Sequence, residues 1–134
     1  MNIELSFKSH LWIGTSLESD ANYMEYFKLD YSSHQENGCP KHKKCRFCID
    51  IGIDWYDEDY ITIIPRFAQE VDLDTLLMTA PVRTEEKNNI KMHCANLGVK
   101  KANAIFCYSE PNLIISEPHK ASYNGLKYIG IYEG

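Results

Sequence analysis

Residues 3–14 read Ile-Glu-Leu-Ser-Phe-Lys-Ser-His-Leu-Trp-Ile-Gly, and this stretch sets the class of fold that we expect. Apolar and polar side chains alternate through Ile3, Leu5 and Phe7, which is the period of a strand with one buried face. The residues just before Gly14 are more continuously apolar. The pattern predicts a strand that becomes buried along its length and ends at Gly14.

Four later segments have the composition of strands, because β-branched and aromatic residues dominate them. They are residues 60–67, 104–108, 113–116 and 128–132. Pro65 has no backbone donor, which places the first of these strands at a sheet edge or at a bulge. The turn signals Pro111-Asn112 and Asn124-Gly125 separate the last three segments. We expect residues 104–108 and 113–116 to form a hairpin.

Three segments carry the start and stop signals of helices. They are residues 19–29 capped by Ser19 or Asp20, residues 72–77 capped by Asp72, and residues 84–97 closed by Gly98. In the first segment the aromatic side chains recur at spacings of three and four and therefore share one face. Residues 32–46 are polar and basic with turn signals, which predicts a loop.

The order of these elements is βαβααβββ, which indicates an α+β domain. We expect a mostly antiparallel sheet of about five strands covered by two or three helices. A single domain spans residues 1–134 in this interpretation, because no repeat, low-complexity stretch or linker interrupts the chain.

The charge balance favours a basic partner over nucleic acid. The chain has 19 acidic and 14 basic residues and a net charge of −5, whereas a nucleic-acid surface must neutralise phosphates. No signal peptide and no membrane-spanning run is present, so we expect a cytoplasmic protein that does not bind membranes. The odd number of cysteines, 5, favours free thiols over a disulfide framework.

The densest charge lies in residues 50–60, which read Asp-Ile-Gly-Ile-Asp-Trp-Tyr-Asp-Glu-Asp-Tyr. Clustered carboxylates steer association with a basic surface, and aromatic rings supply contact area. The predicted partner-binding residues are Asp54, Trp55, Tyr56, Asp57, Glu58 and Asp59. In the alternative interpretation Trp55 and Tyr60 belong to the core and the carboxylates are solvated. A calcium loop is disfavoured because the segment after Asp57 lacks the glycine that such loops require.

A second cluster could bind zinc. Cys39, His42, Cys45 and Cys48 are each separated by two residues, and all four are side chains that zinc accepts. Zinc sites usually take ligand pairs from two separated segments, so a basic loop with free thiols is the preferred interpretation and we expect no metal and no cofactor. A small zinc-binding structural or interaction module remains the alternative function.

Catalytic motifs are absent from the sequence. It contains no Gly-x-Ser-x-Gly elbow, no glycine-rich phosphate loop and no His-Glu-x-x-His helix. His93 and Cys94 are adjacent in a predicted helix, so their side chains diverge and cannot form a nucleophile–base pair. We therefore expect a binding protein and not an enzyme.

Three segments together resemble the immunity protein 22 family. They are residues 10–14 (His-Leu-Trp-Ile-Gly), residues 47–60 (Phe-Cys-Ile-Asp-Ile-Gly-Ile-Asp-Trp-Tyr-Asp-Glu-Asp-Tyr) and residues 127–130 (Lys-Tyr-Ile-Gly). Members share a Leu-Trp-Ile/Val-Gly strand and a Phe-x-x-Asp-x-Gly-Ile-x-Trp/Tyr-Tyr-Asp-x-Asp segment. Residues 34–44 depart from that pattern.

The resemblance implies a small bacterial α+β protein that binds and neutralises a cognate polymorphic toxin, often a nuclease. Combined with the charge, it predicts an inhibitor that occludes the basic active-site surface of that toxin, with Trp55 and Tyr56 as anchors and the neighbouring carboxylates as ion-pair partners. The sequence does not indicate an oligomeric state.

Overall fold

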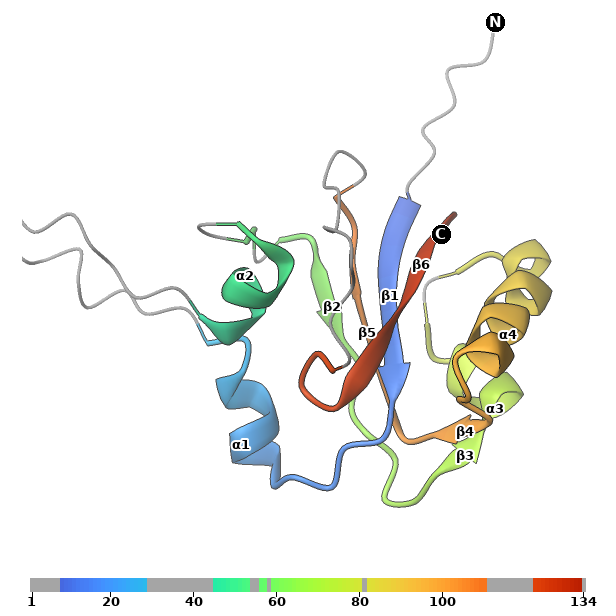
Figure 1. Ribbon diagram of the computed structural model, residues 1–134, viewed down its shortest axis with the longest axis horizontal. Helices are drawn as coiled ribbons and strands as arrows, with labels where there is room; N and C mark the ends of the chain where they lie inside the picture. The colour runs from blue at the N-terminus through green and yellow to red at the C-terminus, as the bar shows by residue number, and fades with distance from the viewer. Residues whose placement is uncertain are drawn as a thin grey trace, which may run out of the picture.

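The computed structural model describes residues 8–28, 45–53, 56–57, 59–80, 82–110 and 122–133. Its centre is a four-stranded antiparallel sheet with the strand order β2-β5-β1-β6 (Figure 1). These strands are β1 Lys8–Gly14, β2 Ile61–Ile63, β5 Ala104–Tyr108 and β6 Leu126–Glu133. A separate two-stranded sheet pairs β3 Val71–Asp72 with β4 Lys101–Ala102.

Helices cover both faces of the four-stranded sheet, so the structure has three layers (Figure 1). One face packs against α1 Asp20–Glu25 and α2 Arg46–Ile51, and the other packs against α3 Leu73–Leu77 and α4 Lys87–Asn96. A short 3-10 helix, η2 Thr84–Glu86, leads into α4. No helix in the described ranges is long and apolar enough to cross a lipid bilayer.

Strand β1 contributes side chains to both cores because successive residues point to opposite faces. Trp12 lies on the α1–α2 side, where its ring stacks on Phe106 with 4.8 Å between ring centroids. Phe47 of α2 meets the same indole edge-on at 5.4 Å. Leu11 and Ile13 lie on the α3–α4 side, and both are fully buried.

The hairpin turn before β6 matches its sequence signal. Asn124 and Gly125 both have positive φ, 61° and 92°, as the two central residues of a tight primed turn require. Paired backbone hydrogen bonds between Tyr123 and Leu126 close the turn, at 2.7 and 3.0 Å. Further along β6 the pairing with β1 shifts by one residue, and Gly130 at φ 146° supplies the backbone conformation that this bulge needs.

Local capping explains where the helices start and stop. The N–H of Asn22 donates to Ser19 Oγ at 3.1 Å, and the N–H of Thr75 donates to Asp72 Oδ1 at 2.8 Å, so both predicted N-caps are confirmed. Gly98 follows α4 with φ 82°, as a left-handed stop requires.

The α+β class and the antiparallel sheet are confirmed, whereas several details of the predicted order βαβααβββ differ. Helix α2 was not predicted, because it is only 6 residues long and its start fell in the predicted loop of residues 32–46. The short strands β3 and β4 were also missed. Strand β2 is shorter than predicted but lies at the sheet edge, as Pro65 indicated.

Part of the predicted hairpin between residues 104–108 and 113–116 lies outside the described residues. Strand β5 itself pairs with β1 along its whole length and with β2 along Phe106–Tyr108, so its neighbours come from distant parts of the chain. Residues 3–7 of the first predicted strand and residue 29 of the first predicted helix also lie outside the described ranges.

We expect Phe106→Ala to be strongly destabilising, because Phe106 is fully buried and contacts Trp12 and Phe27 at 4.8 Å between ring centroids. The loss in the free energy of unfolding should be about 3–5 kcal/mol, measured by urea denaturation. Met78, which is 76% exposed, provides the control, and Met78→Ala should stay within about 0.5 kcal/mol of wild type. Equal effects of the two substitutions would contradict the assigned core.

Candidate functional site

The predicted partner-binding segment lies between α2 and β2. Its described residues are Tyr56, Asp57 and Asp59, and together with the following Tyr60 they form what we call the acidic turn. Asp54, Trp55 and Glu58 lie outside the described residues. The structure therefore shows how the acidic turn is held and places only part of the predicted set.

Hydrogen bonds fix the acidic turn to itself and to the sheet. The N–H of Asp59 donates to Asp57 Oδ1 at 2.9 Å, and the N–H of Tyr60 donates to the Asp57 carbonyl at 3.0 Å. The N–H of Asp57 donates to the Tyr108 hydroxyl at 2.8 Å, which connects the turn to the end of β5. Burial raises the pKa of Tyr108, so this hydroxyl stays protonated and neutral at pH 7.

Tyr56 is a core residue. Its side chain is 3% exposed, and its hydroxyl donates to the carbonyl of Phe27 at 2.6 Å. The ring meets Phe47 edge-on at 5.2 Å. Tyr56 therefore supports the turn from beneath, whereas Tyr60, at 46% exposed, presents an aromatic surface to solvent.

The carboxylates of Asp57 and Asp59 are exposed and form no ion pair with any described residue. Asp20 and Asp74 differ in this respect, because Asp20 pairs with Arg66 and Asp74 pairs with Lys91, each at 2.8 Å. The negative charge of the acidic turn thus remains available to a cationic partner.

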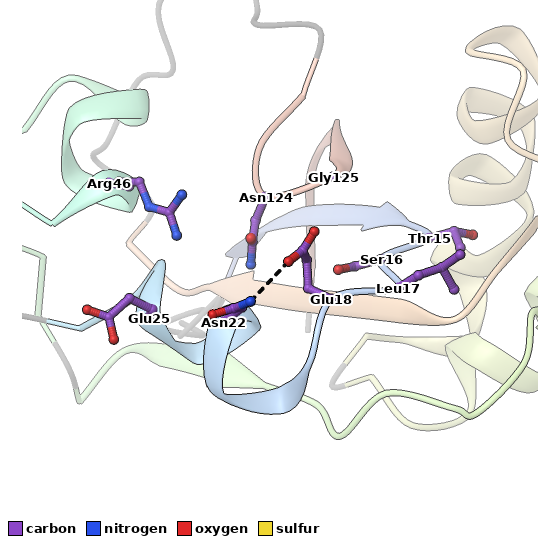
Figure 2. A pocket seen from close by; sticks show the side chains of 9 residues that line it. All are labelled: Thr15, Ser16, Leu17, Glu18, Asn22, Glu25, Arg46, Asn124 and Gly125. Atoms are coloured by element: carbon purple, nitrogen blue, oxygen red, sulfur yellow. Dashed lines mark hydrogen bonds between the residues drawn. The ribbon is translucent and has the colours of Figure 1, made fainter.

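A polar pocket of about 500 Å³ lies at the opposite end of the sheet (Figure 2). The β1–α1 connection, α1, the first residue of α2 and the Asn124-Gly125 turn all contribute to it. The lining residues are Thr15, Ser16, Leu17, Glu18, Asn22, Glu25, Arg46, Asn124 and Gly125. The register shows the separation: Ile61 and His10 align with Tyr108 at one end, while Gly14 aligns with Ala104 at the other.

The pocket lining suits ion pairs and hydrogen bonds. Glu18 accepts a hydrogen bond from Asn22 Nδ2 at 3.3 Å, drawn as a dashed line in Figure 2. The guanidinium of Arg46 lies 5.7 Å from the centroid of the Tyr26 ring. Leu17 beside the pocket is 86% exposed. Sequence reasoning missed this pocket because each lining residue is an ordinary surface residue in its own segment, and only Asn124-Gly125 carried a recognisable signal.

Two of the four predicted zinc ligands, Cys45 and Cys48, lie in the described part of the chain. Their Sγ atoms are 3.1 Å apart, and Cys45 caps α2 by accepting from the N–H of Cys48 at 3.2 Å. The hydrogen bond with Cys48 lowers the pKa of the Cys45 thiol to about 7. Cys39 and His42 lie outside the described residues, and no group of three or more metal-binding side chains occurs within them.

Polar groups between the strands form a buried network that the sequence did not reveal. His10 is 2% exposed, and its Nδ1 lies 2.7 Å from the Tyr128 hydroxyl. Its Nε2 lies 3.2 Å from the carbonyl oxygen of Glu110. Ser9 of β1 and Ser109, the residue that follows β5, share a hydrogen bond of 2.7 Å. These contacts connect β1 to its two neighbours, so we assign them to structure.

We expect Tyr108→Phe to destabilise the protein by about 1 kcal/mol, because the N–H of Asp57 loses its acceptor. Amide hydrogen exchange should also become faster at Asp57. Tyr23→Phe is the matched control, because the buried Tyr23 hydroxyl has no hydrogen-bond partner within the described ranges. Its removal should leave stability unchanged or raise it. A larger loss for Tyr23→Phe than for Tyr108→Phe would contradict this account of the turn.

Comparison with known proteins agrees with the resemblance seen in the sequence. A family model described as immunity protein 22 matches residues 9–133, which include all of β1 but its first residue, the acidic turn and β6. Neither a curated protein nor a solved structure matches the chain. Because the family model covers nearly the whole chain, the protein belongs to the immunity protein 22 family.

Proposed function

We propose that this immunity protein binds a cognate polymorphic toxin in the cytoplasm of the producing cell and neutralises it by covering the basic surface of its active site. The proposed toxin is a nuclease, because the active site of a nuclease must hold nucleic-acid phosphates and therefore presents a basic surface. Family membership supports the immunity role. The net charge of −5 supports a basic partner, since opposite charge accelerates association.

The acidic turn is the proposed contact surface, and the observation that carries this placement is its pair of unpaired carboxylates on a preorganised backbone. Asp57 and Asp59 form no ion pair with any described residue, while three hydrogen bonds hold the turn in place. A preorganised surface loses less conformational entropy on binding than a flexible one. The turn can therefore meet a cationic surface without first being ordered.

The aromatic contact residues in our proposal differ from the predicted anchors Trp55 and Tyr56. Tyr56 is buried, so in our proposal it positions the turn, and the exposed ring of Tyr60 contacts the toxin. Asp54, Trp55 and Glu58 remain part of the proposed surface and lie outside the described residues. The proposal requires no catalytic group, metal or cofactor.

The double substitution Asp57→Asn/Asp59→Asn should weaken toxin binding by at least tenfold, because it removes two charges. The amide introduced at position 57 retains an oxygen that can accept from the N–H of residue 59, so the turn should keep its shape. The measurement is titration calorimetry with the catalytically inactivated domain of the cognate toxin. Glu85→Gln is the matched control, since it removes an exposed carboxylate on η2 and should leave affinity unchanged. Unchanged affinity in the folded double variant would refute this placement of the site without affecting the family assignment.

The immunity role itself is tested by co-expression. Expression of the active toxin domain should arrest growth, and co-expression of this protein should restore growth and yield a complex that survives purification. Association should slow as salt is added, because the steering charge is screened beyond about 8 Å at physiological ionic strength. Continued growth arrest together with the absence of a complex would refute this toxin as the partner.

A further inference from the structure

Strand β2 forms one edge of the four-stranded sheet, and no strand of the described residues pairs with its outer side (Figure 1). In an antiparallel pair, backbone groups of alternate residues point toward the partner strand. The N–H of Ser109 donates to the carbonyl of Tyr60 at 2.9 Å, and the N–H of Ile64 donates to the carbonyl of Ile105 at 3.4 Å. These bonds show that the even-numbered residues of this segment direct their backbone N–H and C=O groups toward β5.

Ile61 and Ile63 must therefore direct their backbone N–H and C=O groups away from β5. No hydrogen bond from any described residue reaches these groups. Their side chains pack on the α1–α2 side of the sheet and are only partly buried. The edge thus offers two residues with free donors and acceptors at the spacing of a strand.

An apolar groove runs beside this open edge, between β2 and α1. One part has a volume of about 420 Å³ and is lined by Met24, Phe27, Tyr56, Ile61 and Ile63 among others. A second part of about 270 Å³ adjoins it and shares Met24 and Ile63. Met24 is 46% exposed between the two parts. An added strand could place alternate side chains in this groove while its backbone pairs with β2.

The charge next to the edge selects the occupant. The acidic turn immediately precedes β2, and its carboxylates have no cationic partner among the described residues. A second copy of this chain would carry a net charge of −5 to the same edge, so electrostatic repulsion opposes that pairing. A segment with basic residues at the turn and apolar residues at the groove satisfies both features.

We propose that the toxin docks by adding an extended segment to the open edge of β2, with basic side chains at Asp57 and Asp59 and apolar side chains in the groove at Met24. This inference rests on the proposed function and specifies the mode of binding. The strand has only 3 residues and Pro65 follows closely, so the backbone pairing fixes the register of the toxin segment and the flanking contacts supply the rest of the affinity.

The test compares Ile63→Pro with Ile63→Ala in binding to the inactivated toxin domain at one ionic strength. Both variants lose the same side chain, but only proline removes the outward N–H, and neither removes a hydrogen bond to β5. Ile63→Pro should bind about tenfold more weakly than Ile63→Ala, with both variants folded by circular dichroism. Equal affinities would overturn docking at this edge.

Amide hydrogen exchange on the wild-type protein provides a measurement that does not depend on the folding of a variant. Toxin binding should newly protect the N–H groups of Ile61 and Ile63, whereas Thr62, which already bonds to β5, should be protected in both states. Unchanged exchange at Ile61 and Ile63 in a formed complex would overturn the docking mode and leave the proposed function standing.

Failure of the wild-type protein to bind the toxin domain would refute the proposed function and the docking mode together. Sedimentation of the protein alone distinguishes the other occupant. A dimer in which Ile61 and Ile63 are protected before toxin is added would assign the edge to a second copy and overturn the proposal.

Discussion

The burial of β1 on both faces is the constraint on which the positions of the other elements depend. Trp12 needs an aromatic environment on one side, and Leu11 and Ile13 need an aliphatic one on the other. A strand buried in this way must also pair along both edges, which β5 and β6 provide. One short segment therefore fixes two cores, two strand neighbours and a helix layer on each face.

This arrangement determines which features meet at the surface. Because β1 and β6 occupy one side of β5, β2 becomes one of the two edge strands of the sheet, and β6 is the other. The hydroxyl of Tyr108, at the end of β5, then holds the N–H of Asp57 and sets the acidic turn at that same edge. The polar pocket around Glu18 and Arg46 forms at the other end of the sheet, where β1 leaves it. The acidic turn and the groove at Met24 are thus neighbours because of the strand order, and the polar pocket is separated from them for the same reason.

Features that depend on a few neighbouring residues could be predicted from the sequence. The caps at Ser19 and Asp72 and the turn at Asn124-Gly125 each use side chains or φ angles within a few residues, so their signals are local. Helix α2 was not predicted because it has only 6 residues and depends on the tertiary burial of Phe47 and Ile51. A short sequence pattern does not indicate such burial.

The tertiary contacts of the site could not be predicted for the same physical reason, because contacts between distant residues leave no local sequence signal. The density of carboxylates pointed to Asp57 and Asp59, but the burial of Tyr56 depends on Phe27, which is 29 positions away in the sequence, as well as on the nearer Phe47. The tether from Asp57 to Tyr108 joins residues separated by 51 positions, and the edge position of β2 depends on the pairing of three other strands.

The two parts of the proposed interface act over different distances. This difference explains how the edge strand can be available to a partner without pairing with unrelated chains. An unpaired strand edge attracts any extended chain, and natural sheets limit this by keeping edges short or by placing proline and charge beside them. Here β2 is short, Pro65 follows it and Asp57 and Asp59 precede it. In the proposed interface, the same carboxylates that repel other acidic chains would attract a basic toxin before any backbone contact forms. The edge can therefore remain available to one class of partner. In the proposed mode, the carboxylates first attract the basic toxin segment, and the backbone of Ile61 and Ile63 then fixes its register.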